Sequence, residues 1–272
     1  DGTKNNPYII HNEEELTLLS QVSQTDSLTN MYFKVTDDKD IFDLTTTGLN
    51  YQPIGNQNVM FKGGFDGNNK TFILNLINQN SDYQGLFGAI GDNALVENIH
   101  IKGLVSGRYY VGALSGLVKN ATILNVSNEA TIIGFRQTAG LIGQAEKSNI
   151  SYVFNKGNVT GNGDTTAGII GYALTNVLVN YAFNYGDITG RTNTGGIIGA
   201  MQTNSVLKYT YNTGLIIGLG ANTGGIVGLN REKSIIDNTY NAGVVRGINV
   251  SNAGVIVGLS QTQAIESNSY YD

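Results

Sequence analysis

Apolar residues recur along this chain in short runs that are framed by glycine, and the frames repeat at nearly constant spacing. Each frame ends in a glycine, and these glycines are Gly88, Gly116, Gly143, Gly171, Gly199, Gly228 and Gly258. Their spacing is about 28 residues, which is typical of stacked-repeat architectures. We therefore expect these seven glycines to be structural residues of a repeat.

Aligning the copies produces three columns of aliphatic residues, separated by Gly, Asn and Thr turns. The columns are Leu86, Leu114, Leu141, Ile169, Ile197, Ile226 and Ile256; Val105, Ile132, Val159, Ile188, Ile216 and Val245; and Val96, Ile123, Ile150, Val179, Leu207 and Ile236. Three short apolar runs per period predict three strands and no long helix. The pattern therefore predicts an all-β, single-stranded parallel β-helix of about 28 residues per rung, right-handed by the crossover rule. A β-propeller is the rival at this period, but its blades need four antiparallel strands.

The first 80 residues follow a different pattern. Asn12 precedes three glutamates and an apolar run through Leu16, Leu18, Leu19 and Val22, which predicts a short capped helix. Such a helix would cover the open end of the β-helix, where strand edges are otherwise unpaired. We divide the chain into a cap with irregular first rungs (1–80) and the repeat region (81–272), and expect the edge near Asp272 to need a further cap or domain.

A further apolar column directly follows the Leu/Ile column of each frame. Its members are Phe87, Ser115, Ile142, Ile170, Ile198, Val227 and Val257. Strict alternation would turn this column outward and create an apolar stripe suited to a partner. We favour the alternative, in which the glycine corner folds both columns inward.

Aromatic residues form the most suggestive candidate site. The candidate ligand-binding residues are Tyr152, Tyr181, Tyr209, Tyr211 and Tyr240, which align in successive copies together with Phe154 and Phe183. If they face outward, their rings offer a platform for sugar rings or another protein. Strict alternation instead places them on the buried face with Ile150 and Val179, and so predicts internal stacking. The aligned Asn155, Asn184, Asn212 and Asn241 predict a hydrogen-bonded asparagine ladder.

Composition and charge reduce the range of possible functions. Charged residues make up 14% of the chain, the formal net charge is −5, and cysteine is absent. Without a basic cluster we expect no nucleic-acid partner, and no apolar run is long enough to span a bilayer. The absence of cysteine excludes disulfides and thiolate metal sites.

Candidate catalytic and metal chemistry is sparse. The cluster of Asp37, Asp38 and Asp40 could hold calcium through oxygen ligands, although a solvated turn is the favoured interpretation. The two histidines, His11 and His100, lie in no recognisable catalytic motif, and the acids of the repeats occupy different columns. We therefore expect no cofactor and no enzymatic activity.

The G-L-x-G frames resemble the GLUG motif of bacterial cell-surface proteins, which include immunoglobulin A proteases and adhesin-like proteins. Three leader segments, at 36–41, 53–55 and 61–68, resemble the region that often precedes such repeats. The resemblance implies an exported, surface-attached module that is often part of a longer protein. The motif contains no catalytic residues.

The leading hypothesis is a non-enzymatic extracellular module of a bacterial surface protein, acting as an adhesin-like binding surface or a rigid spacer. Its partner would be a host protein or glycan. The alternatives are a carbohydrate-binding or carbohydrate-active β-helix protein, and an accessory region of a larger surface protease.

Overall fold

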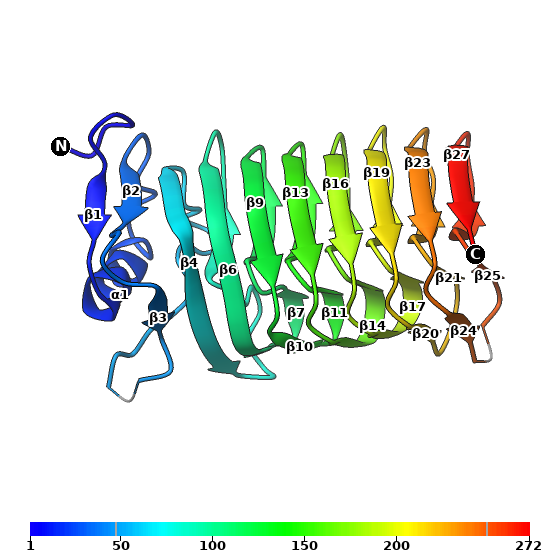
Figure 1. Ribbon diagram of the computed structural model, residues 1–272, viewed down its shortest axis with the longest axis horizontal. Coiled ribbons are helices and arrows are strands. Elements are labelled where there is room, and N and C mark those ends of the chain that lie inside the picture. The colour runs from blue at the N-terminus through cyan, green and yellow to red at the C-terminus, as the bar shows by residue number, and fades with distance from the viewer. Residues whose placement is uncertain (47, 249) are drawn as a thin grey trace.

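The computed structural model describes residues 1–46, 48–248 and 250–272. These residues form a right-handed parallel β-solenoid of about nine turns, with about 29 residues per turn (Figure 1). The described strands belong to one sheet of 20 strands and one of 7 strands. The predicted fold class is therefore confirmed, including the all-β class and the stacking of successive copies.

Each turn contributes strands to three sides of the solenoid and to an inward bend. The first side contains β1 (Tyr8–Ile10), β2 (Tyr32–Val35), β4 (Gly64–Ile77), β6 (Leu95–Ser106), β9 (Thr122–Asn128), β13 (Asn149–Asn155), β16 (Leu178–Asn184), β19 (Val206–Asn212), β23 (Ile235–Asn241) and β27 (Ile265–Tyr271). The second side contains β3 (Ile41–Asp43), β10 (Thr131–Gly134), β14 (Val159–Ala167), β17 (Ile188–Gly195), β20 (Ile216–Gly218) and β24 (Val245–Gly247). Short strands at the bend are β7 (Tyr109–Val111), β11 (Arg136–Ala139), β21 (Thr223–Gly224) and β25 (Ala253–Gly254). The third side is the seven-stranded sheet of β5 (Phe87–Ile90), β8 (Ser115–Lys119), β12 (Ile142–Glu146), β15 (Ile170–Ala173), β18 (Ile198–Met201), β22 (Val227–Asn230) and β26 (Val257–Ser260).

The aliphatic columns predicted from the alignment form the core. Ile150 pairs in register with Val179, and Ile142 with Ile170, so equivalent side chains stack one rung apart. Almost every member of the three columns is buried, and only the last rung departs from this, where Val245 is half-buried. Stacking therefore produces a continuous apolar interior that a single copy could not bury.

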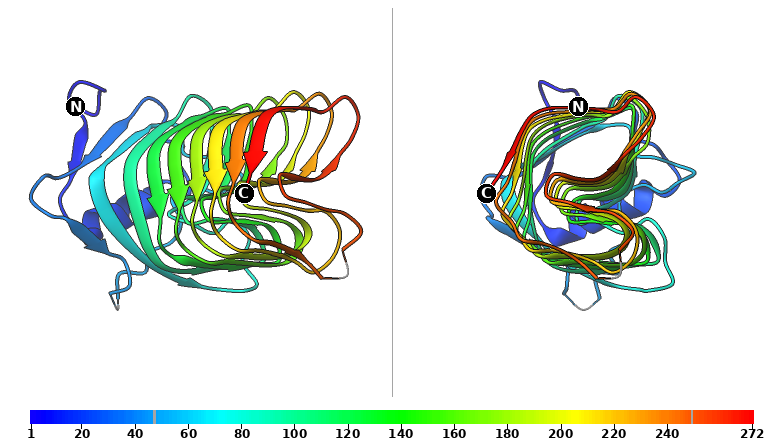
Figure 2. Two further views of the ribbon diagram at one scale, coloured as in Figure 1. Left: turned by 45° about the vertical axis from the view of Figure 1, so that its right-hand side comes forward. Right: turned by 90° about the vertical axis from the view of Figure 1, so that its right-hand side faces the viewer.

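The cross-section bends inward on one side, which three flat strands per turn do not predict (right panel of Figure 2). The bend lies between the short strands and the third side, where the chain passes through the glycine pairs of the repeat. There, the column that begins at Phe87 and includes Ile142 and Ile170 is buried except at Val257 on its last rung, which is half-buried, and the Leu/Ile column before it is buried as well. This confirms that the glycine corner folds both columns inward, and no apolar stripe forms there.

The seven repeat glycines are needed for close backbone approach. A Cβ atom at Gly171 would lie 2.6 Å from the Gly143 carbonyl oxygen, and one at Gly116 would lie 2.5 Å from the Tyr83 Cα. None of the seven has a positive φ, however. Left-handed backbone is supplied mainly by Asn and by Tyr instead. The seven glycines are therefore required for close approach between turns and not for positive φ.

A buried asparagine ladder runs along the solenoid, as predicted. The Nδ2 of Asn155 donates to Asn184 Oδ1 (2.8 Å), Asn184 donates to Asn212 (2.7 Å), and Asn212 donates to Asn241 (2.8 Å). Each amide also bonds the backbone of its own turn; Asn155, for example, donates to the Gly157 carbonyl at 2.7 Å. Both amide hydrogens are therefore used at the inner rungs, which makes complete burial of this polar group tolerable.

The N-terminal end is covered by the helix α1 (Glu13–Val22), as expected (Figures 1 and 2). The Asn12 side chain caps it by accepting a hydrogen bond from the Glu15 N–H at 2.9 Å. Leu16 and Leu19 pack into the core, whereas Leu18 is 59% exposed. The ladder of the first side is continuous across residue 80, because β2 pairs with β4 and β4 pairs with β6.

Candidate functional site: a stacked aromatic face

Three tyrosines on the first side of the solenoid point outward. Tyr152, Tyr181 and Tyr209 are 54%, 38% and 46% exposed. Each has a left-handed backbone, with φ values of 56°, 54° and 54°. A left-handed residue interrupts the two-residue alternation of a strand, so the ring turns to solvent while the next residue returns to the core. The expectation of internal stacking, based on strict alternation, is therefore wrong for these residues.

The three rings stack on one another along the solenoid axis. The ring centroids of Tyr152 and Tyr181 are 4.9 Å apart with planes inclined by 10°, and those of Tyr181 and Tyr209 are 5.2 Å apart and inclined by 16°. The spacing follows the rung repeat of parallel strands. Because each ring partly covers the face of its neighbour, the stack presents mainly ring edges and hydroxyl groups to solvent.

A second aromatic column lies two residues further along the same strands. Phe183 stacks on Tyr211, with centroids 4.4 Å apart and planes inclined by 28°, and Tyr185 meets Tyr211 edge-on at 5.6 Å. Phe154 and Phe183 are half-buried, and Tyr240 is exposed. Partial burial, together with a hydrogen bond to the Tyr185 hydroxyl, raises the pKa of Tyr211 to about 12. Its phenol therefore stays neutral across physiological pH.

We name the outward rings of these two columns the aromatic face: Tyr152, Tyr181, Tyr209, Phe154, Phe183, Tyr185, Tyr211 and Tyr240. All five tyrosines proposed from the sequence belong to it. Sequence reasoning missed Tyr185, which follows the strand β16. Rigid rings with an apolar body and a polar tip are the side chains that most often dominate protein-binding surfaces.

Charged residues flank this face at its N-terminal side. Glu129 lies between two lysines, with its carboxylate 3.2 Å from the Lys102 Nζ and 3.5 Å from the Lys156 Nζ. The Lys156 ammonium also lies 5.7 Å from the centroid of the Phe154 ring. The border of the aromatic face is therefore polar, as at the rim of many interfaces.

His100 is brought together with Ser127 and Glu129, which the sequence did not predict. Its Nδ1 lies 2.6 Å from Ser127 Oγ, and its Nε2 lies 3.7 Å from Glu129 Oε2. Burial lowers the pKa of His100, against the opposing effect of the Glu129 carboxylate. Ser127 is only 8% exposed, so its hydroxyl is poorly placed to reach a substrate.

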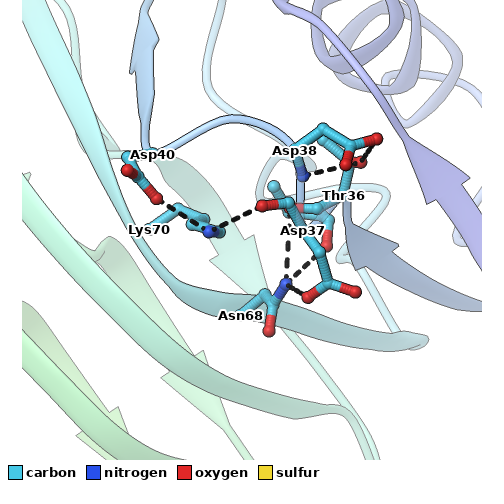
Figure 3. A network of polar contacts seen from close by, with 7 residues as sticks. Thr36, Asp37, Asp38, Asp40, Asn68 and Lys70 are labelled. Carbon is cyan, nitrogen blue, oxygen red and sulfur yellow. Dashed lines mark hydrogen bonds and ion pairs between the residues drawn. The ribbon is translucent and has the colours of Figure 1, made fainter.

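The acidic cluster does not converge on a common point (Figure 3). The Asp40 carboxylate is 2.9 Å from the Lys70 Nζ, whereas Asp37 accepts a hydrogen bond from the Asn68 amide at 2.7 Å. The Asn68 hydrogen bond, with nearby lysines, lowers the pKa of Asp37. Asp38 lies beside Thr36 instead. No group of three or more acidic or histidine side chains suited to a metal ion occurs in residues 1–46, 48–248 and 250–272.

Comparison with known proteins supports the fold. A solved structure from Bacteroides ovatus, described as a "putative immunoglobulin A1 protease", matches 99% of this chain and 76% of its own with a TM-score of 0.63. The two sequences are 18% identical, so the likeness shows a shared β-solenoid fold alone.

One curated relative is also similar in sequence. It is a "Putative Gly-rich membrane protein" of Evansella cellulosilytica, 34% identical over 127 residues. The match covers 43% of this chain and 14% of that protein. No family model matches the chain, so the resemblance to GLUG-motif proteins rests on the repeat itself. No helix in the described parts of the chain is long and apolar enough to cross a membrane.

Proposed function

We propose that this chain is a non-enzymatic, extracellular repeat module of a bacterial surface protein, and that its aromatic face docks a partner protein. The observation that carries the proposal is the outward orientation of Tyr152, Tyr181 and Tyr209. Their stacking fixes the rings before binding, so little side-chain entropy is lost when a partner packs against them. The solenoid would serve as the rigid support that presents this face.

A protein fits the geometry better than a glycan. Sugars pack on open ring faces, whereas the neighbouring rungs partly cover the faces of Tyr181 and its neighbours. The exposed edges and hydroxyls suit an interface in which a partner supplies both apolar contacts and hydrogen bonds. The non-enzymatic part is supported by the poor accessibility of Ser127 and by the sharing of Glu129 between two lysines.

Replacing all three tyrosines by asparagine tests the proposal. Asparagine tolerates positive φ and already occupies the same column at Asn238 (φ 53°), so the triple variant should fold. The wild type and the variant would be compared on surfaces coated with fibronectin, laminin, collagen or immunoglobulin A, and on an array of host glycans. We expect the wild type to bind at least one protein and the variant to bind it at least tenfold more weakly.

The matched control replaces three exposed apolar residues at another corner, Phe135, Leu219 and Ile248, by asparagine. This control should bind like the wild type. A wild type that binds none of the proteins would leave only the spacer role. Equal loss in the control and the test variant would contradict a specific role for the aromatic face.

A further inference from the structure

A second site lies away from the aromatic face, where the N-terminal cap meets the first regular turn. An open cleft of about 490 Å³ is lined by residues of three segments: Gln24 just after α1, the loop at 52–59, and Asp82 to Gln84. Its volume falls within the range of about 300–1,000 Å³ that is usual for small-molecule sites. The repeat glycine Gly88 lets these segments meet, because a Cβ there would lie 2.4 Å from the Gly55 carbonyl oxygen.

Carboxamides dominate the lining of this cleft. They are Gln24, Gln52, Asn56, Gln57, Asn58 and Gln84. A carboxamide both donates and accepts hydrogen bonds, as a sugar hydroxyl does. Gln24 and Asn56 are bonded within the protein, since Asn56 donates to Gln24 and Gln24 donates to the Pro53 carbonyl. The other four can match a group of neighbouring hydroxyls.

The cleft offers no net charge to a ligand. No lysine, arginine or histidine lines it among the described residues. Its one acid, Asp82, is held by Arg108 through two hydrogen bonds of 2.9 Å, and Arg108 lowers the pKa of Asp82. A ligand that depended on its own charge would gain little here, so the lining favours a neutral molecule.

One aromatic ring and one buried amide are fixed in position at the cleft. Tyr83 stacks on Tyr110 with centroids 4.6 Å apart and planes inclined by 8°, so Tyr83 can offer only its other face. Gln84 is 8% exposed, and its Nε2 donates to the Asp82 carbonyl at 3.0 Å. Its Oε1 accepts no hydrogen bond from the residues that the structure describes, and remains an acceptor for a ligand.

From these features we infer that the cleft binds a neutral saccharide. The sugar would pack its apolar face on Tyr83, and its hydroxyls would bond Gln84 and the amides of the 52–59 loop. This site is separate from the aromatic face, so it stands whether or not that face binds a protein.

The test measures binding of cellohexaose, mannohexaose, xylohexaose and maltohexaose by calorimetry and saturation-transfer NMR, with hexagalacturonate as the charged comparison. We expect at least one neutral hexasaccharide to bind more tightly than hexagalacturonate. Tyr83→Asn should weaken this binding at least tenfold, and the double variant Gln57→Ala/Asn58→Ala at least threefold. Asparagine is suitable at position 83 because Tyr83 has φ 57°, and equivalent Asn222 has φ 55°.

The matched control is Phe135→Asn, which removes an exposed aromatic ring that belongs to neither the cleft nor the aromatic face, and it should leave the affinity unchanged. Thermal melting would check that each variant is folded, and the loop variant provides a test that does not touch the Tyr83 stack. The inference is overturned if no neutral hexasaccharide binds the wild type up to about 10 mM. It is also overturned if hexagalacturonate binds the wild type as tightly as the neutral hexasaccharides do. The same holds if both cleft variants bind the neutral hexasaccharide with the affinity of the wild type.

Discussion

Asparagine and tyrosine share one left-handed column on the first side of the solenoid. Asn98, Asn125 and Asn238 have φ values of 60°, 52° and 53°, and the three tyrosines of the aromatic face occupy the rungs between Asn125 and Asn238. Asparagine is among the non-glycine residues that best tolerate positive φ. The presence of asparagine in the same aligned column as the tyrosines was the signal that could have predicted outward rings. The two-residue alternation of inward and outward side chains could not predict them, because it assumes a regular strand.

The left-handed backbone at Tyr181 leads to a prediction about which replacements are tolerated. Tyr181→Asn should cost about 1 kcal/mol, since it removes stacking but fits the backbone. Tyr181→Val should cost about 1–3 kcal/mol more, because a β-branched residue is strained at positive φ. Urea unfolding of the two variants would measure the difference. Equal stabilities would contradict the role of the backbone.

A second prediction at the residue scale concerns pH. Burial lowers the pKa of His100 below its ordinary value of 6.5, so the unfolded chain binds a proton more readily than the folded one. The stability of the wild type should therefore fall as pH decreases below about 6.5. His100→Phe, which extends the column of Phe154, should remove this part of the pH dependence. Urea unfolding between about pH 5.5 and 7.5 would check it, and identical slopes for both proteins would contradict it.

At the scale of elements, the strands and the helix followed from local patterns. The helix α1 was predictable because Asn12 marks its start and Leu16 and Leu19 lie on one face. The apolar pattern did not predict the exposure of Leu18, which points to solvent although it belongs to the same apolar run. The inward bend was not predictable, since it depends on contacts such as that of Gly171 with the neighbouring turn, which lies one period away.

The asparagine ladder leads to a prediction for the strands that carry it. Asn184→Ala would remove the ladder partner of two side-chain atoms, the Nδ2 of Asn155 and the Oδ1 of Asn212. Each buried polar group left unpaired costs about 1–3 kcal/mol, so we expect a loss of about 3 kcal/mol in unfolding free energy. Asn180→Ala on the outer side of the same strand is the control and should cost much less. Chemical unfolding would measure both, and similar losses would contradict a structural role for the ladder.

At the scale of the whole molecule, the period of the sequence was sufficient to predict the architecture. Equivalent residues lie one rung apart throughout the repeat, as Ile170 and Ile198 do. The candidate site was only half predictable. The sequence identified the tyrosines, but whether they bind or pack depends on a backbone conformation that composition does not reveal. The sequence did not indicate the polar cleft, because the segments that line it come from three separate places in the chain.

The repeat also predicts that one turn can be removed. Deleting residues 172–199 joins Gly171 to Ala200, which follows the equivalent glycine, Gly199. The shortened protein should fold, because each turn contacts only its neighbours, and should be less stable. Small-angle scattering should show a solenoid shorter by about 4.8 Å, the spacing of adjacent strands. If the shortened protein did not fold, although the residues on both sides of the deletion are unchanged, the assumption that each turn contributes independently to stability would be contradicted.

The buried ladder also determines how a turn can join the stack. If a strand paired with its neighbour two residues out of place, its inward side chains would still face the interior, but an aliphatic residue such as Ala182 would enter the amide column. The displaced carboxamide would lose its ladder partners and lie in the interior as an unsatisfied polar group. The amides thus discriminate between the correct pairing and a shifted pairing that the apolar interior alone would accept, and so select the register during folding.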